Sequence, residues 1–324
     1  MKAMILAAGF GERLWPLTAD RTKPALPVLG KPLVGYVAEY LAAFGIKDVV
    51  VNLHHEPASV RSALGDGSKF GVHLHYVHEP VILGTSGALD NARELFATET
   101  FVVVNGKIIT NIDLDAAVAQ HRAQNALATL VLKPNVARER FSMIETSAGL
   151  ISRFAGMPAK TANGPAPLMF TGIQILEPRI FDYIPRGVFS DTVINVYPQA
   201  IAKGERVVAH VSEGMWYELS TLQRYLDISL ALLHNGGRHH FAGTNPGIGA
   251  DAMVRDSILW DQVIIGPGAK VQRAVLGDRV RIDAGEIVKD AVVVRADIIA
   301  GKSPPAKALP GEFRGENFVV HLSQ

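Results

Sequence analysis

The sequence predicts an α/β protein in which a Rossmann-like, doubly wound mixed sheet is followed by a C-terminal left-handed parallel β-helix. Two patterns in the 324 residues carry this prediction. Up to about residue 235, short apolar runs alternate with segments of helical periodicity, the pattern of a sheet covered by helices. From residue 248 onward, apolar residues recur at every fifth or sixth position, which is typical of stacked hexapeptide repeats.

The same patterns divide the chain into residues 1–235, residues 248–300 and a C-terminal tail, residues 301–324. The segment 234–247 is rich in glycine and polar residues, so we expect a linker there. The tail contains three prolines and is expected to pack on the outside. The chain length agrees with about two domains of ~150 residues each.

The elements of the first domain follow from hydrophobic periodicity. We expect strands at 3–8, 49–53, 72–77, 101–105, 126–134, 168–176 and 207–211. We expect helices at 33–44, 58–64, 84–96, 113–124, 178–184, 191–203 and 221–234, and a hairpin over 141–154 that turns at Gly149. Ligands of a doubly wound sheet bind at the carboxyl ends of its strands, which places Gly9, Asn52, Gly84 and Asn105 along one rim.

The repeat region can be counted from Ile248. Apolar residues head the next units at Val254, Trp260, Ile265, Val271, Leu276, Ile282, Val288 and Val294. Six of these eight gaps are six residues long and two are five. Each unit is expected to form one side of a triangular coil, because it cannot bury its apolar face alone. A few irregular β-strands are the alternative, since the two short gaps blur the register.

Composition excludes several classes of function. Hydrophobic content of 48% and charged content of 19% are ordinary for a soluble globular protein. The formal charge of +1 offers no electrostatic footprint for nucleic acid or for an anionic membrane. No apolar stretch reaches the ~20 residues of a membrane span. The absence of cysteine excludes disulfides and thiolate metal sites, and with no signal-peptide pattern it predicts a cytoplasmic protein.

A glycine turn at Gly9 and Gly11 follows the first apolar run, and Arg13 and Lys23 come after it. Such a turn lets backbone N–H groups approach phosphate oxygens, while the guanidinium and ammonium groups neutralise their charge. The dinucleotide-binding fingerprint is not met, because Leu14 occupies the place of its third glycine. The phosphate-loop motif is not met either, since no Gly-Lys-Ser/Thr ending is present. The segment therefore predicts an anion site of another kind.

Residues 6–28 resemble the signature of the sugar-1-phosphate nucleotidyltransferases, such as mannose-1-phosphate guanylyltransferases or uridylyltransferases of similar loop sequence. That signature reads L-A-[AG]-G-x-G-[TE]-R-[LM]-x-P-L-T, then K-P-x-x-P-V after a short spacer. Further segments resemble the nucleotide-binding turn, metal-binding strand end, sugar-binding strand and closing motif of this family: LGTSGAL at 83–89, VVNG at 103–106, FTGIQIL at 170–176 and WYELSTLQRYL at 216–226. The resemblance covers residues 1 to about 235, and a β-helix tail also occurs in the family.

The resemblance implies that a sugar-1-phosphate oxygen attacks the α-phosphorus of a nucleoside triphosphate and that pyrophosphate leaves. Arg13 would hold the β- and γ-phosphates, and Lys23 would lie against the α-phosphate. The implied nucleotide-binding residues are Ala7, Ala8, Gly9, Gly11, Gly84, Thr85, Gly87, Asn105 and Gly106. The implied sugar-binding residues are Glu145, Thr171 and Gly172. For Glu145 an exposed hairpin carboxylate is an equal alternative, since only this residue of its segment matches the family.

Three departures from the family pattern concern the metal and the sugar phosphate. Lys107 stands where the family has an aspartate that holds Mg²⁺, and Glu218 stands where it has a second one. Gly156 and Met157 stand where it has an E-K-P lysine segment. A lysine ~4 Å from a divalent ion would repel it by roughly 8 kcal/mol at an effective dielectric of 20. The usual Mg²⁺ site is therefore not expected.

Three explanations of Lys107 stay open. Its ammonium group could replace the metal beside the α-phosphate, with Mg²⁺ held by Glu218 and the triphosphate. It could have abolished turnover, which would leave a nucleotide-binding or nucleotide-sugar-binding regulatory homologue. Or the alignment is locally wrong and Asp113 or Asp115 supplies the carboxylate.

We expect nucleotidyl transfer to a sugar-1-phosphate, with Lys107 as a catalytic group and Mg²⁺ as an uncertain cofactor. The silent homologue is the alternative from another class. Acyl transfer by the β-helix is disfavoured, because hexapeptide acyltransferases commonly use a histidine and residues 248–300 contain none. An open coil end invites pairing, so a homo-oligomer is expected. No nucleic acid or membrane partner is expected.

Overall fold

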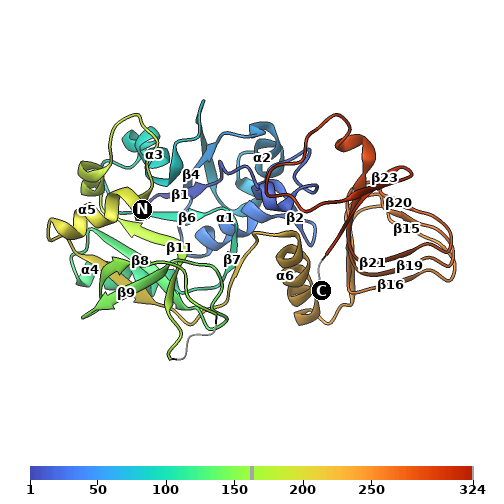
Figure 1. Cartoon of the computed structure of the whole chain (residues 1–324). Coiled ribbons are helices and arrows are strands. Elements are labelled where there is room, and N and C mark those ends of the chain that lie inside the picture. Colours follow the sequence, from blue (N-terminus) through green and yellow to red (C-terminus); the bar gives the residue numbers. More distant parts are fainter. Residues whose placement is uncertain (161–163, 323–324) are drawn as a thin grey trace. The chain divides into compact units, whose positions relative to one another are not determined.

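The computed structural model describes residues 1–160 and 164–322 (Figure 1). By compactness the chain falls into two units. The first contains Met1–Gly9, Val34–Pro57 and Leu64–Trp216, and the second contains Phe10–Leu33, Ala58–Ala63 and Tyr217–Gln324. From Phe10 onward, the signature segment (residues 6–28) thus belongs to the unit that also holds the C-terminal repeats. The domain boundaries expected from the sequence stay predictions, and residues 323–324 of the expected tail lie outside the described residues.

A nine-stranded sheet forms the centre of the first unit, in the order β5-β4-β1-β6-β11-β8-β12-β10-β9 (Figure 1). Its strands are β1 (Ala3–Leu6), β4 (Asp48–Leu53), β5 (His73–His78), β6 (Phe101–Asn105), β8 (Ala128–Pro134), β9 (Met143–Ser147), β10 (Leu150–Phe154), β11 (Leu168–Leu176) and β12 (Val207–Val211). β5, β4, β1 and β6 are parallel, whereas β11 runs antiparallel to β6 and β8. The α/β fold with a mixed sheet is therefore confirmed.

The apolar runs place this sheet in the interior. Met4, Val50 and Val103 share a cluster with residues of two helices, and all three are at most 2% exposed. On the other face of the same strands, Ile5, Val51 and Val104 are 0% exposed. Strands buried on both faces are typical of parallel sheets between helices. Along the chain, β4 and β5 are added on one side of β1, and β6 is then added on its other side. The carboxyl ends of β1, β4 and β6 therefore form a rim at a topological switch point.

The helices that accompany the sheet are α1 (Leu33–Ala43), α3 (Gly84–Asn91), α4 (Leu114–Ala123) and α5 (Tyr197–Ala202), with two further short strands, β7 (Ile108–Thr110) and β13 (Trp216–Glu218). Two expected helices are shorter than predicted. The helix expected at 84–96 ends at Asn91 and is followed by a 3-10 turn. The helix expected at 191–203 opens with a π turn, and α5 starts where Pro198 removes a backbone donor. The segment 178–183 is a 3-10 turn, and the hairpin at Gly149 forms as expected.

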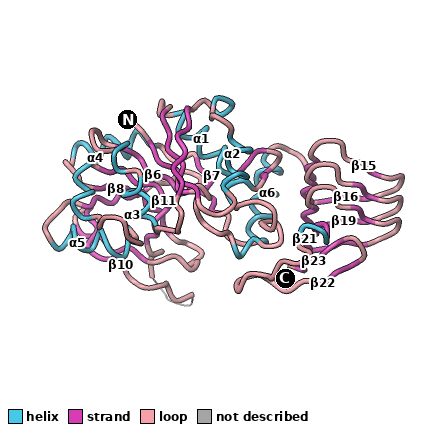
Figure 2. Tube along the Cα trace, turned by 90° about the horizontal axis from the view of Figure 1, so that it is seen from above, coloured by secondary structure: helices cyan, strands magenta, loops and turns pink. Residues whose placement is uncertain are grey.

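The second unit is built on parallel strands stacked with a constant offset (Figure 2). Gly247 lies opposite Ile264, and Ile264 lies opposite Arg281. The Asp261 amide donates to Asp278 Oδ1 across the same interval of 17 residues. The elements of this unit are β2 (Pro27–Val28), β3 (Lys31–Pro32), α2 (Pro57–Leu64), α6 (Leu222–Asn235), β14 (His240–Ala242), β15 (Gly247–Ile248), β16 (Met253–Arg255), β17 (Ser257–Leu259), β18 (Ile264–Ile265), β19 (Lys270–Leu276), β20 (Arg281–Ile282), β21 (Ile287–Arg295), β22 (Glu312–Arg314) and β23 (Asn317–His321). The chain therefore forms parallel coils of equal length. The left-handed sense of the coil stays a prediction.

Each coil turns at three corners where the backbone has a positive φ. The corner residues repeat at the same offset as the strands: Asn245, Gln262 and Arg279; Asp251, Gly268 and Gly285; Asp256, Arg273 and Asp290. Between the corners, apolar side chains such as Ile265, Val271 and Ile282 point into a common core. Three sides of six, six and five residues explain both the expected hexapeptide spacing and its two short gaps.

The register corrects two expectations. Leu259, Leu276 and Val293 lie opposite one another, so the unit heads placed at Trp260 and Val294 are each one residue too late. The expected linker 234–247 contains β14, which pairs in parallel with β17. The first coil therefore begins before residue 248.

The tail adds a hairpin to the last coil. β23 pairs antiparallel with β21, and β22 pairs with β23. The tail is thus part of the sheet rather than only packed on its outside. Because β23 covers the edge of β21, that end of the coil does not supply the open edge on which the homo-oligomer was predicted. Among the residues that the structure describes, no helix combines the length and apolar character needed to cross a bilayer.

Candidate active site

A buried hydrogen-bond network shapes the rim of the first unit. The Ala7 amide donates to Asn52 Oδ1 at 2.7 Å, and Asn52 Nδ2 donates to Glu79 Oε1 at 2.7 Å. The other oxygen, Glu79 Oε2, accepts from the Leu83 amide at 3.1 Å, just before α3. Glu79 is 0% exposed, so its carboxylate can be stable there only with such donors. The network therefore fixes the end of β1 to the turn that carries the predicted nucleotide residues 84–87.

The sequence places Asn52 on the rim, but it gives no comparable sign of Glu79. A single glutamate after a strand has no signature of its own, because its role depends on which backbone amides the fold brings to it. The only available signal is its position directly after β5.

The ends of β1 and β6 touch closely. Leu6 lies opposite Asn105, and the Gly106 amide donates to the Leu6 carbonyl at 2.9 Å. A Cβ on Gly106 would lie 2.9 Å from the same carbonyl oxygen, so a side chain does not fit there. Lys107 follows in the turn between β6 and β7 and is half-buried. The structure thus sets Lys107 at a strand end whose backbone is held in place.

A bulge in β11 brings a predicted sugar-binding residue to a predicted nucleotide-binding residue. Gly172 has a φ of +85°, and a Cβ there would lie 2.2 Å from Asn105 Nδ2. Next to it, the buried Thr171 hydroxyl donates to the Val131 carbonyl at 2.8 Å. The Trp216 indole N–H donates to the Thr171 carbonyl at 2.9 Å. Asn105, Thr171 and Gly172 therefore form one packed group at the middle of the sheet.

The turn at 84–87 is fixed by a neighbouring segment. Cβ atoms on Gly84 and Gly87 would lie 2.5 Å from the Ser190 carbonyl oxygen and 2.7 Å from the Val188 carbonyl oxygen, respectively. The Thr85 hydroxyl donates to Asp191 Oδ1 at 3.0 Å. The close approach of residues 188–190 is thus a sufficient reason for both glycines. Their role in shaping a base and ribose pocket stays a prediction.

Glu145 is held by a partner on its own hairpin. Its carboxylate, 49% exposed, forms a two-pronged ion pair with Arg153 of β10, whose Nε donates at 3.0 Å. This hydrogen bond lowers the pKa of Glu145 below its ordinary value. The geometry is that of the exposed hairpin carboxylate that the sequence left as an alternative, and sugar binding by Glu145 stays a prediction.

The signature segment leaves the first unit at Gly9 and folds back on itself in the second. A Cβ on Gly9 would meet no atom within 4 Å, so packing does not require glycine at this position. Gly11 has a φ of +70°, and its Cβ would lie 3.1 Å from the Cβ of Lys23. The fold therefore brings the glycine turn beside Lys23, while Arg13 is exposed. An open glycine, an exposed guanidinium and an ammonium group are suited to a phosphate chain.

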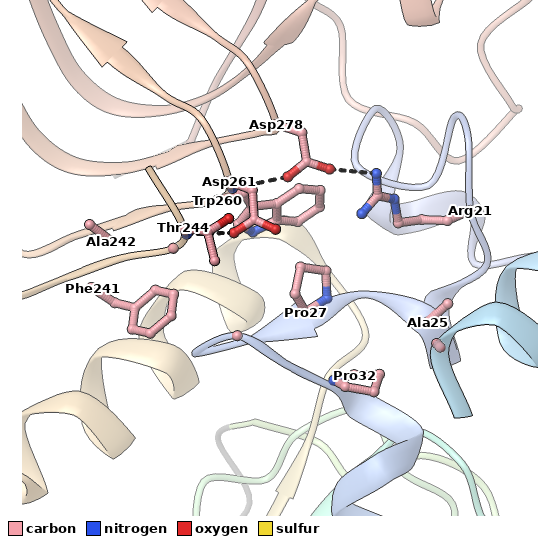
Figure 3. Close-up of a pocket in the computed structure, with 13 residues that line it drawn as sticks. Arg21, Ala25, Pro27, Pro32, Phe241, Ala242, Thr244, Trp260, Asp261 and Asp278 are labelled. Atoms are coloured by element: carbon pink, nitrogen blue, oxygen red, sulfur yellow. Dashed lines mark hydrogen bonds and ion pairs between the residues drawn. The ribbon is translucent and has the colours of Figure 1, made fainter. Parts of the chain in front are cut away.

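Arg21 and Tyr225 anchor this segment, and no sequence motif points to either. Arg21 Nη2 donates to Asp278 Oδ2 at 2.7 Å, and its guanidinium lies 5.0 Å from the ring centre of Trp260 (Figure 3). Tyr225 of α6 donates its hydroxyl to the Pro27 carbonyl and accepts from Trp260 Nε1. Arg21, Trp260 and Asp278 line a hollow of about 490 Å³. The segment is therefore attached to the coil through Arg21 and to α6 through Pro27.

The donor set does not fit a Mg²⁺ ion held by two aspartates. Lys107 occupies one of the implied positions, and buried Glu218, 3% exposed, occupies the other. The alternative ligand Asp113 caps α4, because its Oδ1 accepts from the Ala116 amide at 3.0 Å. Asp115 lies in the first turn of the same helix, where it stabilises the helix dipole. Lys107 at the first implied position therefore does not match a site built on two aspartates.

Known proteins resemble this chain over most of its length. Residues 2–235 match the family described as nucleotidyl transferase. The N-acetylmuramate α-1-phosphate uridylyltransferase of Neisseria meningitidis is 35% identical over 234 residues, which cover 69% of this chain and 95% of that protein. The UTP–glucose-1-phosphate uridylyltransferase of Synechocystis is 33% identical over 69% of this chain, which spans only 61% of that relative's length.

Two further similarities extend this picture. The mannose-1-phosphate guanylyltransferase of Mycobacterium tuberculosis is 28% identical over 83% of this chain and 77% of its own. A crystal structure of a protein assigned as a glucose-1-phosphate thymidylyltransferase from Bacillus anthracis aligns with a TM-score of 0.61 and 26% identity, covering 71% of this chain and 95% of that one.

Proposed function

Because the chain belongs to the nucleotidyl transferase family, we propose that it transfers a nucleotidyl group from a nucleoside triphosphate to a sugar-1-phosphate. The products are a nucleoside-diphosphate sugar and pyrophosphate. The proposal is carried by the signature segment, in which the exposed Arg13 and the Gly11–Lys23 contact follow β1 directly along the chain. The names of the relatives include uridylyl and guanylyl transfer to sugar-1-phosphates, so base and sugar are left open.

The proposed reaction is a single in-line displacement. A phosphate oxygen of the sugar-1-phosphate forms a bond to the α-phosphorus, and the bond from that phosphorus to the bridging oxygen breaks. Pyrophosphate leaves with the electron pair. No covalent intermediate with the protein is needed, so catalysis rests on positioning and on neutralising the phosphate charge.

Each cationic residue has a proposed place in this reaction. Arg13 holds the β- and γ-phosphates that leave, and Lys23 neutralises the crowded α-phosphate. Lys107 supplies a further positive charge, at the position where the resemblance implies an aspartate. A fixed ammonium group can stabilise the same developing charge as a metal ion, because both act electrostatically.

A second function is favoured by the same residue. Lys107 stands where the resemblance implies one aspartate, and Glu218 stands where it implies the second. These two departures also agree with a homologue that binds a nucleotide or nucleotide sugar without turnover. Such a protein would act by regulating a partner.

One assay separates the two functions. The purified full-length protein is incubated with a panel of nucleoside triphosphates and sugar-1-phosphates, with and without Mg²⁺, and both pyrophosphate release and nucleotide binding are measured. Release with at least one pair supports the enzyme. Binding without release across the panel contradicts it and supports the regulatory homologue.

Lys107→Asp then tests the role of the lysine, with Lys270→Asp on the coil as a control of equal charge change. Loss of turnover in the first variant alone would assign Lys107 to catalysis. A gain of Mg²⁺-dependent turnover would show that the lysine had replaced a functional metal ligand and was not itself catalytic.

A further inference from the structure

Three side chains with metal-binding atoms converge where α6 meets the first coil. His234 lies in the last turn of α6, His239 in the segment that follows it, and Asp256 at a corner between β16 and β17. One ligand atom from each lies within 4.8 Å of the other two. His234 Nε2 and Asp256 Oδ1 are 3.1 Å apart. In the described part of the chain, no other group of three such residues meets this criterion.

The backbone around these residues is already held. The Asp256 amide donates to the His239 carbonyl at 2.7 Å, which joins two of the three residues directly. Immediately afterwards, His240 pairs with Ser257 in the parallel β14–β17 ladder. The end of α6 is closed by hydrogen bonds from Gly237 to His234 and from Arg238 to Leu233. Binding at this place would order few additional backbone bonds, which keeps the entropic cost small.

The charges around these three side chains are compatible with a bound cation. The carboxyl end of the 14-residue helix α6 carries the negative end of the helix dipole, and Asp256 adds a carboxylate. Arg255 Nε is 3.5 Å from Asp256 Oδ2, but its side chain is 74% exposed and can turn into solvent. On the next coil, Arg273 is occupied by Asp290 at 2.9 Å and by Asp227 of α6 at 3.3 Å.

We propose that His234, His239 and Asp256 bind one divalent transition-metal ion of the Zn²⁺ type. Two imidazole nitrogens and one carboxylate oxygen favour Zn²⁺ over Mg²⁺ and Ca²⁺, which prefer oxygen ligands alone. Three protein ligands leave a fourth position for water. The ion joins the end of α6 to the corner of the first coil at Asp256. This site is separate from the proposed transfer reaction and does not depend on it.

The competing description is a plain ion pair between protonated His234 and Asp256, with His239 as a bystander. That pair needs only two of the three residues. The metal site needs all three, so His239 is the residue that distinguishes the two descriptions.

The test uses the full-length protein and Zn²⁺ alone, with Co²⁺ as a spectroscopic probe. Titration calorimetry of the protein freed of metal by a chelator should show one site per chain, and Zn²⁺ should raise the melting temperature. His239→Ala and Asp256→Asn should each weaken binding at least about tenfold, the second variant being able to keep the corner's positive φ. His240→Ala, the adjacent exposed histidine, is the matched control and should bind as the wild type does.

Co²⁺ should give visible absorption of a four-coordinate nitrogen and oxygen site in the wild type and in His240→Ala, and lose it in His239→Ala. Zn²⁺ binding that is unchanged in His239→Ala would be adventitious and would overturn the proposal. Absence of saturable binding at 100 μM Zn²⁺, about the weakest affinity that such a fastening role allows, would overturn it as well.

Discussion

The mixed sheet of the first unit and the coil of the second differ in how positions with a positive φ or a close backbone contact are distributed. In the first unit, Gly172 has a φ of +85° beside the Asn105 side chain, and a Cβ on Gly106 would meet the Leu6 carbonyl oxygen at 2.9 Å. In the coil, positive φ angles recur at the same corner of successive turns and are shared by glycine, aspartate, asparagine, glutamine and arginine. Irregularity that is specific to one position marks the candidate site, whereas irregularity that repeats marks a scaffold.

The largest expected effect comes from removing a charge from the signature segment. Arg13→Gln should lower the rate of nucleotidyl transfer about 100- to 1,000-fold, because one oriented donor to the phosphates is lost. The melting temperature should stay unchanged, since Arg13 is exposed. Steady-state pyrophosphate release measures the rate. A rate equal to that of the wild type would show that Arg13 takes no part in the reaction.

Gly172→Ala places a side chain on the positive-φ residue in the bulge of β11. The new Cβ would lie 2.2 Å from Asn105 Nδ2 at a φ of +85°, so we expect a loss of about 2–4 kcal/mol in the free energy of unfolding. Urea denaturation measures it. Gly9→Ala is the control, since its Cβ would meet no atom within 4 Å, and it should change stability by less than about 0.5 kcal/mol.

His121 makes the first unit sensitive to acid. It is 1% exposed and bonded to Thr129 and Glu177, and burial lowers its pKa below 6.5 despite the opposing effect of Glu177. The unfolded chain therefore takes up a proton first, and stability is lost as the pH falls from 6.5 towards the lowered pKa of the folded state. Melting temperatures from pH 7.5 to 5 should fall more steeply for the wild type than for His121→Gln. Parallel curves would contradict this assignment.

Gly268→Asn probes the repeating irregularity and should have the smallest effect. Gly268 has a φ of +68° but no atom near its Cβ, and Asp251 occupies the same corner of the preceding coil at a φ of 58°. A cost below about 1 kcal/mol is expected, because asparagine tolerates this conformation. A loss as large as that of Gly172→Ala would show that the corners are as specific as the site.

The strands were predictable from apolar runs, since burial on both faces leaves little choice of residue. The register of the coil was not. Leu259 and Trp260 are adjacent and both apolar, but Leu259 points into the coil while Trp260 donates to Tyr225 of α6. Sequence spacing cannot tell which of two apolar neighbours faces inward. β14 was missed because the glycines around it outweigh its three residues.

Within the candidate site, the glycines and cations could be proposed from the sequence because their chemistry is local to a motif. Glu79, Asp191 and Arg21 were not, because each acts on a residue that is distant in sequence. The distance along the chain from Arg21 to Asp278 is 257 residues, and no local pattern reports such a pair.

The antiparallel closure of β21 by β23 has a consequence for how this chain can change in length. Duplicating or deleting one whole coil would keep both the ladder offset and the three corners, whereas adding a single side would displace every corner beyond it. New coils cannot be appended after β21, because the hairpin already occupies its edge. Growth of this protein must therefore occur in whole coils and from the inside.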